Sequence, residues 1–173
     1  MKAVSSKIEL SGVELGALPG FDTDGMRTGM TKVLLVDDSK FLRIATERAL
    51  ARAGYEVSTA ADGEKALEMA REKHPDVILL DMLLPKMAGP DVLKALKKDP
   101  ATSGIAVVVL TGLSHKNAAR LQQDGASAFL EKSELGLEKG CETLLTELAR
   151  IVQRLHLEAP VGTLALSKAT HQS

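Results

Sequence analysis

The chain has 173 residues, 22 basic against 23 acidic side chains, 45% hydrophobic residues and only 2% aromatic ones. This length and composition suit one domain with a hydrophobic core, while the balanced charge and the scarcity of aromatic residues argue against nucleic acid as the main partner. The single cysteine excludes an internal disulfide and a multi-cysteine metal cage, and no apolar run approaches the ~18 residues that span a bilayer.

The two ends of the chain differ from its middle. Residues 1–30 contain repeated glycines and no lasting helical or strand period, so we expect a flexible N-terminal extension there. Residues 157–173 include a proline and a glycine and end in polar residues, so we expect a C-terminal tail. The start of the chain lacks the apolar core of a signal peptide, and we therefore expect a cytoplasmic protein. The folded domain is expected over residues 31–156.

Short apolar runs alternate with longer, helix-like stretches between these ends. The apolar runs predict buried strands at residues 33–36, 56–60, 77–80, 105–110 and 128–130. The stretches that follow them predict helices at residues 39–52, 62–72, 89–98, 115–123 and 141–155. Five strands that alternate with five helices predict an α/β fold, a doubly wound parallel sheet with helices on both faces.

Polar side chains follow the predicted strands, at the edge where open α/β sheets bind their ligands. Asp37 and Asp38 follow the first strand, Asp81 the third, Thr111 the fourth and Lys132 the fifth. Three carboxylates held together repel one another, and a divalent cation such as Mg²⁺ removes that repulsion. The ammonium and hydroxyl groups would stabilise an anion beside the metal. This set predicts a pocket in which a carboxylate attacks a phosphoryl group.

Four segments carry a resemblance to a known family: VLLVDDS at 33–39, LLDMLLPKMAG at 79–89, VLTG at 109–112 and FLEK at 129–132. In this order and spacing, residues 32–156 resemble the receiver domain of two-component response regulators. The resemblance implies the flavodoxin-like strand order 2-1-3-4-5. It also implies a stand-alone phosphorelay receiver, because fewer than twenty residues follow residue 154 and cannot form an output domain.

The resemblance further implies a role for each site residue. Asp81 would be the phosphoacceptor, and Mg²⁺ would be held by Asp37, Asp38, Asp81 and the backbone carbonyl of Leu83. Thr111 and Lys132 would contact the phosphoryl group, and Phe129 would be the switch aromatic. The implied partners are a sensor histidine kinase or phosphotransfer protein and a downstream target protein. The target would bind the face formed by the fourth helix, fifth strand and fifth helix. No enzyme activity is implied beyond the chain's own phosphoryl transfer and dephosphorylation.

Several features leave the interpretation open. Most receivers have proline after the lysine, whereas this chain has Ser133, so the geometry of that peptide bond is not predicted. Phe129 would also suit an ordinary core position, and Cys141 is expected to be a packed thiol on the last helix. The lack of glycine-rich nucleotide motifs disfavours a cofactor-binding enzyme on the same fold. A phosphorylation-independent pseudo-receiver, which acts only as an interaction module, stays as the alternative function.

The residues two positions past Asp81 and Thr111 are Leu83 and Leu113. In receivers, these positions flank the approach of the water that hydrolyses the acyl phosphate. Leucine cannot orient a water molecule and hinders its approach. We therefore expect slow self-dephosphorylation.

Overall fold

The computed structural model describes residues 30–112, 118–133 and 141–158. Strands and helices alternate along these residues in the order β1 (Lys32–Val36), α1 (Lys40–Arg52), β2 (Glu56–Ala60), α2 (Gly63–Lys73), β3 (Val77–Asp81), α3 (Gly89–Lys98), β4 (Ala106–Thr111), α4 (Ala118–Gln123), β5 (Ala128–Glu131) and α5 (Glu142–Glu158). All ten predicted elements are present, two with the predicted bounds. The segments expected as extension and tail lie outside the described residues, apart from Met30 and the end of α5.

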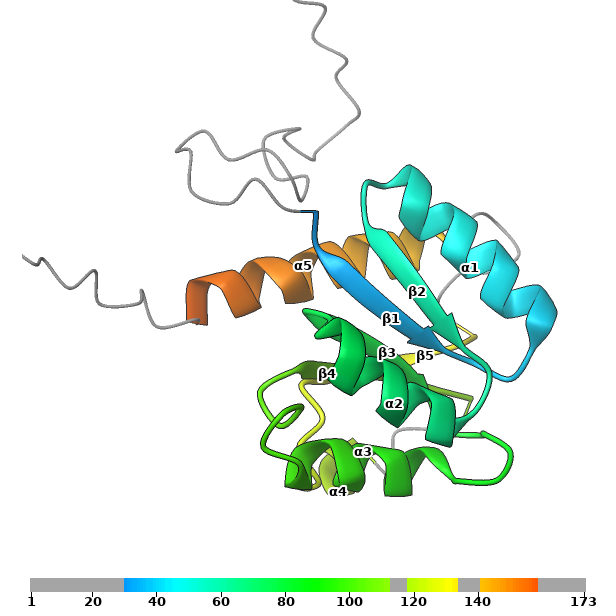
Figure 1. Cartoon of the computed structure of the whole chain (residues 1–173). Helices are drawn as coiled ribbons and strands as arrows, with labels where there is room; N and C mark the ends of the chain where they lie inside the picture. The colour runs from blue at the N-terminus through cyan, green and yellow to red at the C-terminus, as the bar shows by residue number, and fades with distance from the viewer. Residues whose placement is uncertain (1–29, 113–117, 134–140, 159–173) are drawn as a thin grey trace, which may run out of the picture.

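The five strands form one parallel sheet in the order β2-β1-β3-β4-β5 (Figure 1). This order confirms the predicted α/β fold. The chain leaves β1 toward β2 on one side and returns to β3 on the other side, so the strand order reverses between β1 and β3. The crevice at the carboxyl ends of such neighbouring strands is where doubly wound sheets bind ligands.

Helices cover both faces of the sheet (Figure 1). One face packs against α2, α3 and α4, and the other packs against α1 and α5. The central strand β3 is buried along its whole length, and so is β4. Strands covered on both faces read as continuous apolar runs. This is why the Val, Ile and Leu runs of the sequence predicted them correctly.

Local signals set the starts of two helices. The hydroxyl of Ser39 accepts a hydrogen bond from the Leu42 amide at the start of α1, and the Asp62 carboxylate accepts one from the Lys65 amide at the start of α2. Such N-caps satisfy amide groups that the helix itself leaves unpaired. Because Ser39 directly follows the acidic pair of the first strand end, this cap also determines where α1 leaves the sheet.

The last helix differs from the prediction at both ends. Cys141 precedes α5 instead of lying within it, and its backbone has the left-handed φ of 64°. Its side chain is buried against the α1–α5 face of the sheet, and this burial raises the pKa of the thiol. At the other end α5 continues through Glu158, two residues past the predicted domain boundary.

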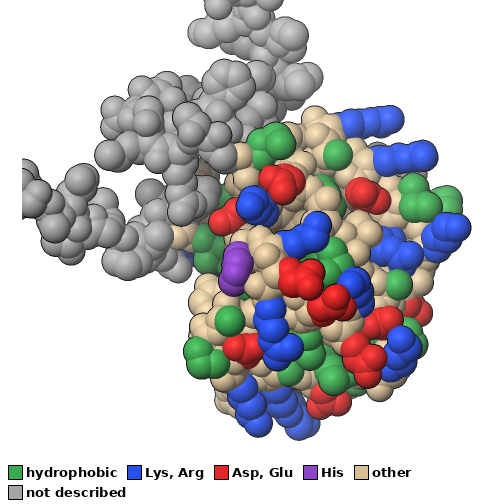
Figure 2. Space-filling model, in the orientation of Figure 1, with side chains coloured by type: hydrophobic (Ala, Val, Ile, Leu, Met, Phe, Trp, Pro, Cys, Tyr) green, Lys and Arg blue, Asp and Glu red, His purple; other side chains and the backbone are tan. Residues whose placement is uncertain are grey.

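The visible surface carries charges of both signs, interspersed with small apolar areas (Figure 2). This mixture agrees with the net charge of −1. Among the helices in the described ranges, none is long and apolar enough to cross a membrane.

Candidate functional site

Three aspartates meet at the carboxyl ends of β1 and β3. The pairing of Val36 with Leu80 places Asp37, just past β1, beside Asp81 at the end of β3. One carboxylate oxygen from each of Asp37, Asp38 and Asp81 lies within 4.8 Å of the others. Asp37 and Asp81 are each only 3% exposed, whereas Asp38 is exposed to solvent. The structure thus brings together the three acids that the sequence predicted as one cluster.

The two buried carboxylates are held by backbone amides on one side. The Ser39 amide donates to Oδ1 of Asp37 over 2.8 Å, and the Leu83 amide donates to Oδ1 of Asp81 over 3.0 Å. Both bonds close the turn that directly follows the strand. Each turn therefore aims its carboxylate into the crevice and leaves the second oxygen free for another partner.

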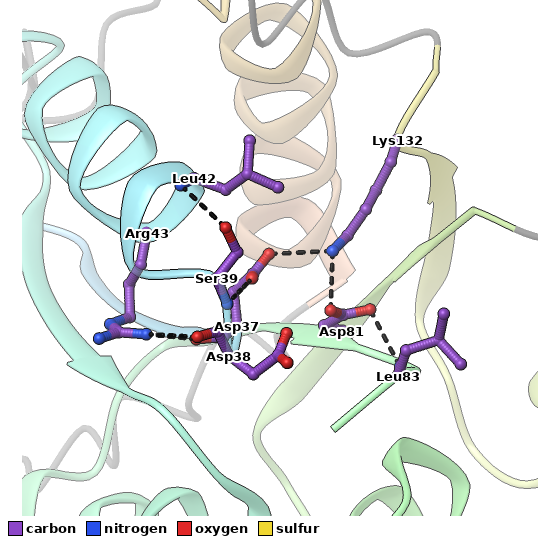
Figure 3. A network of polar contacts seen from close by, with 8 residues as sticks. All are labelled: Asp37, Asp38, Ser39, Leu42, Arg43, Asp81, Leu83 and Lys132. Atoms are coloured by element: carbon purple, nitrogen blue, oxygen red, sulfur yellow. Dashed lines mark hydrogen bonds and ion pairs between the residues drawn. The ribbon is translucent and has the colours of Figure 1, made fainter. Parts of the chain in front are cut away.

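The ammonium of Lys132 donates hydrogen bonds to the second oxygens of both carboxylates. Its Nζ lies 3.0 Å from Oδ2 of Asp37 and 2.7 Å from Oδ2 of Asp81 (Figure 3). Since β5 is two strands away from β3, the side chain must bridge roughly 10 Å between strand axes. A long side chain is needed to reach the acids from that position. The predicted positive charge is thus present and lies in direct contact with the acids.

The environment of Lys132 contains two opposing effects. Burial disfavours the charged ammonium, but the hydrogen bonds and Coulombic attraction of Asp81 and Asp37 together outweigh it, so the pKa of Lys132 is raised. The ammonium is therefore charged at neutral pH. It compensates part of the negative charge of the cluster.

The acidic cluster fits a small divalent cation. Its side-chain donors are all carboxylate oxygens, and one of its acids is exposed, which leaves room for water ligands. Mg²⁺ prefers oxygen ligands of this kind, with few carboxylates and several waters. A cation that used the Oδ2 atoms of Asp37 and Asp81 would compete for them with the ammonium of Lys132.

Thr111 and Phe129 lie on the neighbouring strands. Thr111 ends β4, is 7% exposed, and accepts a hydrogen bond from the Lys132 amide at its backbone carbonyl over 2.8 Å. This bond joins the end of β4 to the residue that contacts the acids. Phe129 is half-buried in β5 and packs against the core cluster that contains Leu121 of α4. Both residues therefore connect the crevice with the region of α4 and β5.

The remaining predicted positions have mixed outcomes. Leu83 lies two residues past Asp81 and is 65% exposed, and its effect on dephosphorylation stays a prediction. Leu113 lies outside the described residues. No peptide bond within the described ranges is cis, so the bond between Lys132 and Ser133 is trans.

The sequence-based prediction missed Arg43 of α1. Its Nη1 donates to the backbone carbonyl of Asp37 over 2.7 Å and lies 3.4 Å from that of Asp38 (Figure 3). The residue pattern gave no signal for this contact, because every residue has a backbone carbonyl.

Comparison with known families gives a direct match. The model of the response regulator receiver domain matches residues 33–141 of this chain. This confirms the resemblance that the sequence motifs indicated.

Individual relatives agree with this match. A gliding motility regulatory protein of Myxococcus xanthus is 43% identical over 109 residues, which are 62% of this chain but 14% of that protein. The polar-differentiation response regulator DivK of Brucella ovis is 37% identical over 105 residues, which are 60% of this chain and 85% of DivK. The solved structure of the chemotaxis response regulator CheY4 of Vibrio cholerae is similar with a TM-score of 0.64 and 35% identity, and the match covers 71% of this chain and 99% of CheY4.

Proposed function

Because this chain belongs to the response regulator receiver domain family, we propose that it receives a phosphoryl group on Asp81 and passes the signal on through a protein-binding surface. The single observation that carries this proposal is the triad of Asp37, Asp81 and Lys132 at the reversal point of the sheet. Two buried carboxylates share one ammonium there, so the crevice holds a nucleophile and a positive group side by side.

In the proposed transfer, a carboxylate oxygen of Asp81 forms a bond to phosphorus. The bond between phosphorus and the donor's imidazole nitrogen breaks, and its electrons leave with the imidazole. The product is an acyl phosphate on Asp81. Asp37, Asp38, Asp81 and the backbone carbonyl of Leu83 would hold Mg²⁺, which supplies positive charge beside the phosphoryl oxygens.

Lys132 would stabilise the charge that develops on the transferred group. Its ammonium lies 2.7 Å from Oδ2 of Asp81, so a phosphoryl group attached there falls within its reach. Thr111, which ends the neighbouring strand β4, would supply a hydroxyl donor from the opposite side. Both groups would stabilise the phosphorylated state through charge-assisted hydrogen bonds.

The signal would leave the site through β4 and β5. A phosphoryl group that draws Thr111 toward it would also disturb Phe129, because Phe129 of β5 pairs with Val109 of β4 and packs against the core near α4. We therefore propose the face formed by α4, β5 and α5 as the surface for a downstream protein. A sensor histidine kinase or phosphotransfer protein would supply the phosphoryl group, and the chain would act as a cytoplasmic signalling module rather than as an enzyme on other substrates.

The test is phosphorylation of the full chain with labelled acetyl phosphate in the presence of Mg²⁺. We expect the wild type to take up label and Asp81→Asn to lose it, because the amide keeps the shape but not the nucleophile. Asp91→Asn, at an exposed aspartate in the first turn of α3, is the matched control and should label normally. A wild type without label would instead favour the phosphorylation-independent interaction module, and label that persists in Asp81→Asn would show that the acceptor is misassigned.

A further inference from the structure

We propose that Arg43 is a positioning residue that aims the carboxylate of Asp38 and thereby strengthens Mg²⁺ binding by the acidic cluster. This inference rests on the proposed function, which makes that cluster a Mg²⁺ site. Arg43 touches none of the three carboxylates. Within the described residues, the polar contacts of its side chain are those with the backbone carbonyls of Asp37 and Asp38, through one guanidinium nitrogen (Figure 3).

The two contacted carbonyls belong to the two peptide units on either side of the Asp38 Cα atom. Each peptide unit is planar, so the direction of its carbonyl defines the orientation of the whole unit. A guanidinium that holds both carbonyls therefore restrains φ and ψ of Asp38. These two angles set the direction in which the side chain of Asp38 leaves the backbone.

Asp38 needs such a restraint more than the other two acids do. Asp37 and Asp81 are buried, and each is held by one backbone amide and by Lys132. The carboxylate of Asp38 is exposed and forms no hydrogen bond or ion pair within the described part of the chain. Only its backbone is held, and Arg43 provides that restraint together with the Ser39 cap of α1.

The position of Arg43 in α1 supports the same role. Side chains of a helix lean toward its N-terminus, which lets Arg43 reach back to the strand end. A cation near the N-terminus of a helix is disfavoured by the helix dipole. The first turns of α2, α3 and α5 each contain an acidic residue, whereas those of α1 and α4 contain none. The two carbonyl contacts give this unfavourable placement a physical reason.

A positioning role and a purely electrostatic role predict opposite results. A guanidinium near three carboxylates repels an incoming cation, so its removal would tighten metal binding if charge alone mattered. If Arg43 aims Asp38, its removal would weaken binding, since Mg²⁺ requires near-ideal ligand geometry. Loss of a residue that orients a metal ligand typically weakens metal affinity about 10- to 100-fold.

The experiment is a calorimetric titration of the full chain with Mg²⁺. We expect Arg43→Met to bind about tenfold more weakly than the wild type, at the low end of that range because Asp38 is one of several ligands. Arg43→Lys keeps the positive charge and should lose less Mg²⁺ affinity than Arg43→Met. Arg48→Met removes the same charge from α1, at an exposed residue that lines a surface groove together with Leu145 of α5, and should bind Mg²⁺ as the wild type does. Equal or tighter binding by Arg43→Met would overturn the inference.

A double-mutant cycle tests whether Arg43 acts through Asp38. In the Asp38→Asn background, Arg43→Met should cause little further loss of Mg²⁺ affinity; an undiminished loss would overturn the inference. The ratio of Mg²⁺ to Ca²⁺ affinity should also fall in Arg43→Met, because Ca²⁺ tolerates irregular geometry.

Two controls allow the Mg²⁺ titrations of the Arg43 variants to be interpreted. Circular dichroism checks that the variants are folded, and Arg43→Gln, which is neutral but cannot span both carbonyls, replaces Arg43→Met if the latter is not folded. A wild type that binds no Mg²⁺ would contradict the proposed metal site itself. A wild type that binds Mg²⁺, with folded Arg43 variants that bind equally well, would contradict only the role of Arg43.

Discussion

Replacing Lys132 with methionine should destabilise the metal-free protein and make it more dependent on Mg²⁺. The methionine side chain keeps most of the length and volume but removes the ammonium that lies between Asp37 and Asp81. Within the described part of the chain, both carboxylates would then be buried without a cationic partner. The raised pKa of Lys132 stabilises the folded state fully below the usual lysine pKa, and this contribution is lost as the pH rises through the folded-state value. At pH 7 the substitution therefore removes the whole stabilising contribution of the Lys132 ammonium.

The structure sets the expected magnitude. Removing one partner of a buried ion pair costs about 3–5 kcal/mol because an uncompensated charge stays behind. The Lys132 side chain is 21% exposed while the two carboxylates are 5% and 4% exposed, so water can reach the vacated position and replace part of the interaction. We therefore expect a loss of about 2–3 kcal/mol in the free energy of unfolding at pH 7, below the full cost of an unpaired buried charge.

Mg²⁺ should reduce the difference in the free energy of unfolding between the wild type and Lys132→Met. A ligand that binds only the folded state stabilises it by about 2.7 kcal/mol at a concentration 100 times its Kd. In the variant, the metal no longer competes with an ammonium for the Oδ2 atoms, so its Kd should fall and its stabilising effect should grow. The assay is urea unfolding of both proteins, with and without Mg²⁺, and with Lys98→Met as an exposed control. Equal stabilisation of wild type and Lys132→Met by Mg²⁺ would refute the competition between metal and ammonium.

Three further predictions concern the strand ends and the core. Gly89→Ala should lower both the stability of the protein and its rate of phosphorylation, because an added Cβ would lie 2.5 Å from the backbone oxygen of Asp81. Gly104→Ala is the control and should leave both unchanged, because a Cβ added there has no atom within 4 Å. Leu83→Asn should shorten the half-life of the phosphorylated protein, measured by loss of label, because an amide beside Asp81 can orient a water molecule; an unchanged half-life would contradict the shielding role of the leucine. Burial raises the pKa of Tyr55 to about 12, so absorbance at 295 nm, which reports the only tyrosine of the chain, should titrate near that value. The unfolded state loses that proton near pH 10, so the free energy of unfolding should fall by roughly 2–3 kcal/mol between pH 10 and 12, and Tyr55→Phe should abolish this part of the loss.

The sequence predicted the acidic cluster because two simple rules combine there. Apolar runs mark buried parallel strands, and the polar residue that ends each run lies at the same edge of the sheet. Asp37 and Asp81 follow their runs directly, so their proximity needed only the strand order, which the family resemblance supplied. The structure confirms that order.

Other features of the site depend on side-chain directions that no residue pattern encodes. The bridge from Lys132 to both acids requires a side chain that crosses the end of β4, and its partners lie 51 and 95 residues away in the chain. Arg43 binds backbone carbonyls, which every residue has, so its target leaves no mark in the sequence. Cys141 fits the spacing of the apolar stripe of α5, yet its left-handed backbone places it before the helix.

The strand order also divides the site between regions of different local stability. Asp37 and Asp81 extend from β1 and β3, whose residues are almost all buried, whereas Lys132 follows β5, a four-residue edge strand whose residues are all half-buried. Elements with few buried contacts open with lower free energy than the core does. We therefore expect amide hydrogens of β5 to exchange with solvent well before those of β1 and β3. Transient opening of this edge would withdraw the ammonium while the acids keep their places, so the charge of the crevice would fluctuate on the timescale of edge-strand opening rather than that of global unfolding.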